Sequence, residues 1–158
     1  MTPYGKVAQA AIASMSLLAE RYSPKGGVRL NSREIAQQRK LSQAIVAKVL
    51  TTLSQVGLVM GAPGPGGGYW LAKDPNEISL LDVVSPFDRL EETLVCPFGE
   101  GWCGTGPQCP LHEQLDGFRQ QVSTFLAETT LACFQKRENP VGPPRIVPFD
   151  LSGPPTKT

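Results

Sequence analysis

The chain has 158 residues, of which 41% are hydrophobic and 18% are charged, enough for one modest core or for a small domain with an appended helix. No stretch approaches the roughly 20 unbroken apolar residues of a membrane span, so we expect no membrane partner. The net charge of +1 hides an asymmetry: residues 1–60 carry eight Lys or Arg against two Glu, a net +6, and the remainder carries seven basic and twelve acidic residues, a net −5. Residues 1–60, the basic half of the chain, are therefore predicted to bind a polyanion, and the acidic remainder of the chain is predicted to have a different function.

A first helix is predicted from about Gly5 to Tyr22, because its apolar residues recur at helical spacing and Ser23 and Pro24 end the run. Its apolar stretch is interrupted by three polar residues, Gln9, Ser14 and Ser16, and no convincing cleavage region follows it. We therefore expect no secretory signal and a cytoplasmic location.

Two further helices follow closely. Asn31 and Glu34 form a capping-box pattern for a short helix that ends near Arg39 and Lys40. Ser42 then caps a longer helix that Gly57 closes, with one apolar face made of Ile45, Val46, Val49, Leu50, Leu53 and Val56. Two helices joined by a turn of a few residues, the second longer and with a polar opposite face, predict a helix-turn-helix.

A short hairpin is predicted after these helices. Residues 58–60 and 69–71 have the pattern of two strands, and the segment 61–68, Gly-Ala-Pro-Gly-Pro-Gly-Gly-Gly, has that of the turn between them. Alone, the third helix is equally compatible with a core helix and the hairpin with a flexible loop. Their order within the basic half predicts a DNA-binding winged helix.

In such a fold the second helix of the pair enters the major groove with its N-terminal residues near base edges. The residues at the start or on the polar side of this helix are Ser42, Gln43, Ala44, Ala47 and Lys48. Gln43 suits an adenine edge, and the cations suited to phosphates are Lys48, Arg33, Arg39 and Lys40. For each cation the alternative is an ordinary solvated surface position.

A loop rich in glycine and proline holds four candidate metal ligands within seventeen residues: Cys96, Cys103, Cys109 and His112. Three thiolates and one imidazole satisfy a tetrahedral zinc ion or anchor an iron–sulfur cluster. Disulfide pairing is the alternative, and the expected cytosolic location argues against it.

A long helix follows the loop from Leu111. Its apolar positions form a heptad-like seam made of Leu115, Phe118, Val122, Phe125 and Thr129, with Leu126 alongside. A lone helix must bury such a stripe, and a second copy of the same helix is the economical partner, so we expect a two-fold homodimer. Cys133 falls on the same face and is expected to be a small buried hydrophobe rather than a ligand.

The predicted fold is mostly α: a winged helix-turn-helix with a two-stranded wing (1–85), a cluster-binding loop (86–110), a dimerisation helix (111–136) and a proline-rich, disordered tail (137–158). A short helix that Ser79 and Asp82 cap and Pro86 ends joins the wing to the loop.

Over residues 4 to about 134 the chain resembles the IscR and NsrR family of bacterial winged-helix transcription regulators. The resemblance rests on the helix-turn-helix, Gly57-Leu58-Val59, the wing sequence 64–69, the segment 77–84 and the three loop cysteines. The ending Cys-Pro-Leu-His at 109–112 is closer to IscR, whose cluster uses three cysteines and a histidine, than to NsrR.

The resemblance implies a homodimer that binds double-stranded promoter DNA, is not an enzyme, and senses redox state, nitric oxide or iron through an iron–sulfur cluster in each subunit, 2Fe–2S rather than 4Fe–4S. Two positions depart from the family pattern. Pro63 stands where the family wing commonly has Arg, and six residues rather than five separate Cys96 from Cys103.

Two alternatives stay open. A winged-helix DNA-binding protein with a structural Cys3His zinc site fits the same four ligands. An electron carrier or an enzyme would leave the helix-turn-helix and the basic half unexplained, and His112 is the only histidine for a nucleophile–base arrangement.

Overall fold

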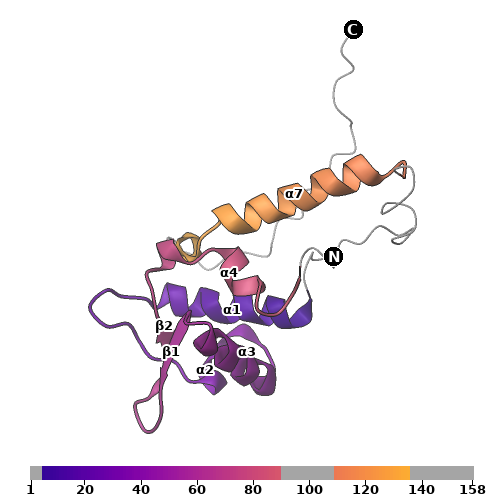
Figure 1. Cartoon of the computed structure of the whole chain (residues 1–158). Helices are drawn as coiled ribbons and strands as arrows, with labels where there is room; N and C mark the ends of the chain where they lie inside the picture. The colour runs from indigo at the N-terminus through magenta and orange to yellow at the C-terminus, as the bar shows by residue number, and fades with distance from the viewer. Residues whose placement is uncertain (1–4, 90–108, 136–158) are drawn as a thin grey trace.

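The computed structural model describes residues 5–89 and 109–135 and is mostly helical (Figure 1). In chain order the elements are α1 (Lys6–Glu20), α2 (Ser32–Arg39), α3 (Gln43–Gln55), β1 (Val59–Ala62), β2 (Gly68–Leu71), the 3-10 turn η1 (Pro75–Glu77), α4 (Leu80–Val84), α7 (His112–Glu128) and the 3-10 turn η2 (Leu131–Phe134). Within this part of the chain, no helix has both the length and the apolar character needed to cross a membrane.

Helix α1 is the centre of the core. Nine of its fifteen residues are buried, so it is covered on more than one face, with contacts to α2, α3, α4 and η2. Many of the buried residues are alanines, which let neighbouring helices approach closely. The hydroxyl of buried Ser14 donates to the Ala10 carbonyl at 2.7 Å, so this polar group is satisfied inside the helix.

The helix-turn-helix forms as the sequence predicts. The Asn31 side chain accepts from the Glu34 N–H at 2.9 Å, and the Glu34 carboxylate accepts from the Asn31 N–H at 2.7 Å, which completes the capping box of α2. Lys40 ends α2 in the left-handed conformation, with φ of 55°. Three residues separate α2 from α3, and Ser42 occupies the N-cap position of α3, although its side chain makes no capping hydrogen bond.

The buried face of α3 is narrower than predicted. Val46, Val49, Leu50 and Leu53 are fully buried, but Ile45 is 39% exposed and Val56 is 50% exposed, so the prediction for these last two was wrong. Val56 is already the C-cap residue, and Ile45 is turned away from the stripe that faces α1 and α2.

The wing is an antiparallel hairpin whose register pairs Val59 with Leu71 and Gly61 with Tyr69. Tyr69 also bridges to Leu30, which makes the segment before α2 a third, one-residue strand beside β2. Gly68 makes this approach possible, because a Cβ at this position would lie 3.0 Å from the Leu30 backbone. Strand β1 runs two residues further than predicted.

Helix α7 ends at Glu128, earlier than the predicted residue 136. Beyond it the chain turns extended and pairs with the segment before α4: the Leu80 N–H donates to the Thr129 carbonyl at 2.8 Å, and the Leu131 N–H donates to the Ile78 carbonyl at 2.9 Å. Cys133 consequently lies on η2 and is exposed, so the predicted burial on a continuing helix was wrong for the single chain. The C-terminal end of α7 packs near α4, while its N-terminal end projects away from the core (Figure 1).

Candidate nucleic-acid interface and metal centre

The solvent face of α3 carries the predicted base-reading residues. Ser42, Gln43, Ala44 and Lys48 are exposed, and Ala47 is half-buried. Helices α2 and α3 and the hairpin lie at the same end of the molecule (Figure 1). This end is therefore shaped as a protruding helix beside a protruding hairpin.

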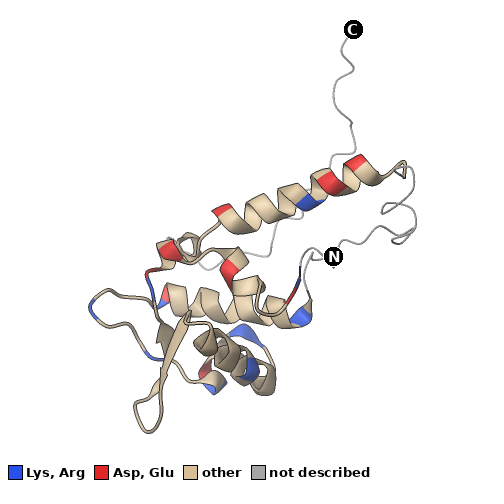
Figure 2. Cartoon of the chain, in the orientation of Figure 1, with Lys and Arg blue, Asp and Glu red and all other residues tan. Residues whose placement is uncertain are grey.

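The electrostatics of this face come from the helices and not from the wing. Arg33, Lys40 and Lys48 are exposed, and the one acidic residue between positions 31 and 60, Glu34, is engaged in the capping box. Residues 59–71 contain no Lys or Arg, and the hairpin in Figure 2 has the tan colour of uncharged residues. A polyanion approaching this end would meet its cations at α2 and α3.

Arg39 is placed differently from the other predicted phosphate contacts. Its Nε donates to the Ala13 carbonyl at 3.0 Å, and its Nη2 donates to the Ser16 hydroxyl at 2.9 Å and to Glu20 Oε1 at 2.5 Å. All three acceptors belong to α1. The guanidinium joins α2 to α1, and a phosphate contact would have to compete with these bonds.

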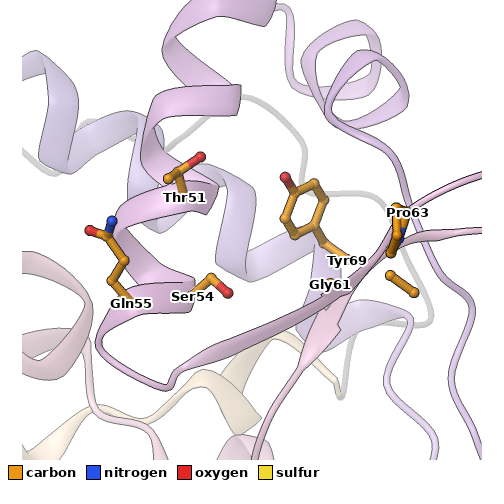
Figure 3. Close-up of a pocket in the computed structure, with 7 residues that line it drawn as sticks. Thr51, Ser54, Gln55, Gly61, Pro63 and Tyr69 are labelled. Atoms are coloured by element: carbon orange, nitrogen blue, oxygen red, sulfur yellow. The ribbon is translucent and has the colours of Figure 1, made fainter.

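An open groove of about 580 Å³ lies between the second half of α3 and the wing (Figure 3). Its lining is uncharged and comes from Thr51, Ser54, Gln55, Gly61, Ala62, Pro63 and Tyr69. The sequence reasoning missed these residues, although continuing the polar face of α3 from Ala47 in steps of four residues would have reached Thr51 and Gln55.

A basic–aromatic contact occupies the other face of the hairpin. The Arg29 guanidinium lies 4.7 Å from the centroid of the Trp70 ring, a cation–π arrangement. Trp70 follows Tyr69 in β2, and successive strand residues face opposite ways, so this contact is separated from the groove by the sheet.

The candidate metal ligands fall partly within the described residues. Cys96 and Cys103 lie outside them, whereas Cys109 is 4% exposed and His112 is half-buried. The His112 N–H donates to the Cys109 carbonyl at 3.0 Å in the turn that begins α7. This turn places a buried thiol and an imidazole together at one helix start.

Among residues 5–89 and 109–135, no group of three or more His, Cys, Asp or Glu side chains gathers as a metal site. The donors at 109 and 112 fit both chemistries considered above, because thiolate and imidazole bind zinc and also ligate iron–sulfur clusters. The described residues thus supply two candidate ligands, and the other two come from the segment 90–108.

A helix-turn-helix with an exposed second helix and an adjacent two-stranded wing defines a winged-helix transcription regulator. The sequence matches the Rrf2 family, described as iron-dependent transcriptional regulators, over residues 5–137. The chain belongs to this family.

Relatives and solved structures agree with this assignment. The HTH-type transcriptional regulator IscR of Serratia proteamaculans is 31% identical over 132 residues, which cover 84% of this chain and 76% of the relative. IscR of Yersinia enterocolitica is 30% identical over the same share of each chain. These relatives are transcription regulators, which agrees with the expectation that the chain is not an enzyme.

Two solved structures share the fold. The IscR structure of T. potens has a TM-score of 0.63 at 20% identity and covers 81% of this chain and 82% of its own. CymR, the global cysteine regulator of B. subtilis, has a TM-score of 0.66 at 23% identity and covers 85% of this chain and 97% of its own. At these identities the likeness supports the winged-helix fold.

Proposed function

We propose that this regulator is a homodimer that binds double-stranded promoter DNA and senses redox state, nitric oxide or iron through a 2Fe–2S cluster in each subunit. The proposed ligands are Cys96, Cys103, Cys109 and His112. The observation that carries the proposal is the turn from Cys109 to His112, because it puts two candidate ligands at the start of the helix whose exposed seam is suited to a second copy.

The proposed DNA contacts divide by chemistry. Gln43 is the first residue of α3 and is exposed, so it is assigned to a base edge, with Ser42 and Ala44 beside it. Three exposed cations are assigned to phosphates: Arg33, Lys40 and Lys48. The wing, lacking cations, is assigned a contact that depends on shape rather than charge.

The proposed dimer uses the seam of α7. Phe118 is 48% exposed and Phe125 is 56% exposed, while Leu115 and Val122 on the same seam are half-buried. A second copy of α7 would remove this apolar surface from water, at a gain of roughly 25 cal/mol for each Å². Two α3 helices held by such a dimer would have to reach half-sites about 34 Å apart.

The cluster is proposed to set the distance between the two α3 helices of the dimer. When bound, it would supply an electron-accepting, oxidant-sensitive centre whose ligation ties the segment containing Cys96 and Cys103 to the first turn of α7. His112 and Cys109 transmit that constraint, since both belong to the turn that opens the dimer helix. Loss of the cluster would release the constraint and change DNA affinity.

A structural zinc site is the second candidate, because Cys3His suits zinc on the same residues. Anaerobic purification with iron, sulfide and zinc analysis separates the two. Iron, sulfide and visible absorption are expected; a colourless protein with one zinc per subunit would contradict the cluster and favour zinc.

DNA binding is then measured with and without the cluster, on promoter fragments that include the chain's own upstream region. Different affinities in the two states are expected. A His112→Ala variant should stay coloured but lose its cluster faster, with Gln114→Ala, an exposed position on α7, as the matched control. An unchanged lifetime in His112→Ala would remove this residue from the ligand set.

A further inference from the structure

The groove between α3 and the wing lies where a DNA strand would pass. The major and minor grooves of B-DNA are separated by one sugar–phosphate backbone. If α3 occupies a major groove and the wing reaches the neighbouring minor groove, that backbone must cross between them. We propose that the groove binds a backbone phosphate and that the Tyr69 hydroxyl is its hydrogen-bond donor; this rests on the proposed DNA binding.

Tyr69 is held in a defined position by the hairpin. Its N–H donates to the Leu30 carbonyl at 2.8 Å, and its carbonyl accepts from the Leu30 N–H at 3.1 Å. On the other side it pairs with Gly61. The main chain of Tyr69 is thus fixed by both neighbouring strands.

Gly61 makes room for the Tyr69 ring. A Cβ at position 61 would lie 3.1 Å from Tyr69 Cε1 and 3.2 Å from Cδ1, so the ring occupies the space that another side chain would need. Figure 3 shows the hydroxyl end of Tyr69 directed from the wing toward α3, on the side of Thr51. The hydroxyl therefore reaches into the groove from a rigid support.

The lining offers several hydrogen-bond donors, namely the hydroxyls of Thr51, Ser54 and Tyr69 and the Gln55 amide, and Tyr69 is the one that the hairpin holds. A phosphate oxygen accepts hydrogen bonds, so its partner must have a proton to give. The Thr51 hydroxyl already donates to the Ala47 carbonyl at 2.9 Å. Within the described part of the chain the Tyr69 hydroxyl makes no hydrogen bond, which leaves its proton available for a bound phosphate.

Because the groove is uncharged, a phosphate contact in it should be recognisable by the salt dependence of DNA affinity. A Lys or Arg on a phosphate displaces counterions, so it steepens the dependence of affinity on salt, by about 0.9 per phosphate. A neutral hydroxyl displaces none. Residues 59–71 carry no cation, so a phosphate held in this groove should add affinity without adding to the salt slope.

The test is the variant Tyr69→Phe in the full-length, cluster-loaded protein, titrated at several salt concentrations against a promoter fragment that the wild type retards. Binding should weaken about tenfold for each half-site, or about a hundredfold for the dimer, because each half-site loses a charge-assisted hydrogen bond, and the slope of log K against log salt should not change. Lys48→Ala is the contrast: it should weaken binding and also reduce the slope by about 2 for the dimer.

Tyr22→Phe is the matched control, because it removes a phenol hydroxyl from a half-buried tyrosine of the loop between α1 and α2. Tyr22 lines a separate pocket together with Trp70, whose side chain lies across the sheet from the groove. It should bind as the wild type does. Thermal melts of all variants confirm that each is folded. Ethylation interference should show one phosphate per half-site whose ethylation weakens the wild type but no longer affects Tyr69→Phe.

The outcomes separate the two proposals. If the wild type retards promoter DNA and Tyr69→Phe binds equally well, or loses salt dependence as Lys48→Ala does, the phosphate assignment is overturned and DNA binding stands. If the wild type retards no fragment in either cluster state, both are overturned.

Discussion

Arg39 and Glu20 form an ion pair that joins the last residue of α2 to the last residue of α1, with Nη2 and Oε1 2.5 Å apart. The same guanidinium bonds the Ala13 carbonyl and the Ser16 hydroxyl. Because α3 follows α2 after a short turn, these bonds help set the direction of α3 relative to the core. Arg39, one of the cations predicted to contact DNA, is thus engaged in holding α2 of the helix-turn-helix against α1.

Arg39→Ala should therefore lower the free energy of unfolding and leave the salt slope of DNA binding nearly unchanged. The guanidinium is partly exposed, with 26% of its side chain accessible, so we expect a loss of about 1–2 kcal/mol in the free energy of unfolding. Urea denaturation measures it. Arg33→Ala is the control, since this exposed residue should leave stability unchanged but lower the salt slope of DNA binding. If Arg39→Ala instead left stability unchanged and lowered the salt slope, Arg39 would be assigned to a phosphate contact.

Local signals in the sequence predicted most of the winged helix-turn-helix. The capping boxes at Asn31 and Ser79 formed as expected, and Gly57 ends α3 with φ of 76°. These features depend on residues within a few positions of one another, so one sequence suffices to find them.

Features that depend on distant parts of the chain were not predictable. The bonds of Arg39 reach residues 19 to 26 positions away, and α7 ends early because Thr129 and Leu131 pair with the segment at Ile78 and Leu80. The groove depends on Gly61 facing Tyr69, a register that only the folded hairpin defines. For the metal site, sequence spacing predicted four ligands, of which the described residues place two.

Gln43→Ala should lower specificity more than affinity. Gln43 opens α3 and is exposed, in the position suited to a base edge. Removing a bidentate amide should reduce discrimination at one base pair of each half-site by about 1–3 kcal/mol. Binding to a panel of operators substituted at each position measures this. Equal losses at every position would instead identify Gln43 as a backbone contact.

Glutamate at Phe118 and Phe125 together should produce a monomer. Both side chains are about half exposed in the single chain, so the double substitution should not disturb the core, whereas two carboxylates in an apolar seam would face two others in the partner. Sedimentation equilibrium should show the change in mass, and promoter affinity should fall with it. Gln121→Glu, exposed on the same helix, adds charge without touching the seam. A double variant that stays dimeric would place the interface elsewhere.

Gly68→Ala should destabilise the wing. Gly68 has φ of 142°, and its new Cβ would lie 3.0 Å from backbone atoms of Leu30, so the pairing of Leu30 with Tyr69 must open. We expect a loss of about 1–3 kcal/mol in unfolding free energy and weaker DNA binding. Gly117→Ala is the opposite case, because its Cβ would meet nothing within 4 Å inside α7. It should raise stability by about 0.5–1 kcal/mol, and similar effects of both substitutions would contradict the close approach at Leu30.

Replacing the two described cysteines separately should distinguish a ligand from a bystander. Cys109 is buried at the start of α7 and is a proposed ligand, whereas Cys133 is exposed on η2, outside the proposed set. Cys109→Ser should lower iron and sulfide content, visible absorption and the difference in DNA binding between the loaded and cluster-free states. Cys133→Ser should preserve all three. Since both substitutions exchange one sulfur for oxygen, a loss of colour in both would show general instability, and retention of colour and metal in Cys109→Ser would exclude Cys109 as a necessary ligand.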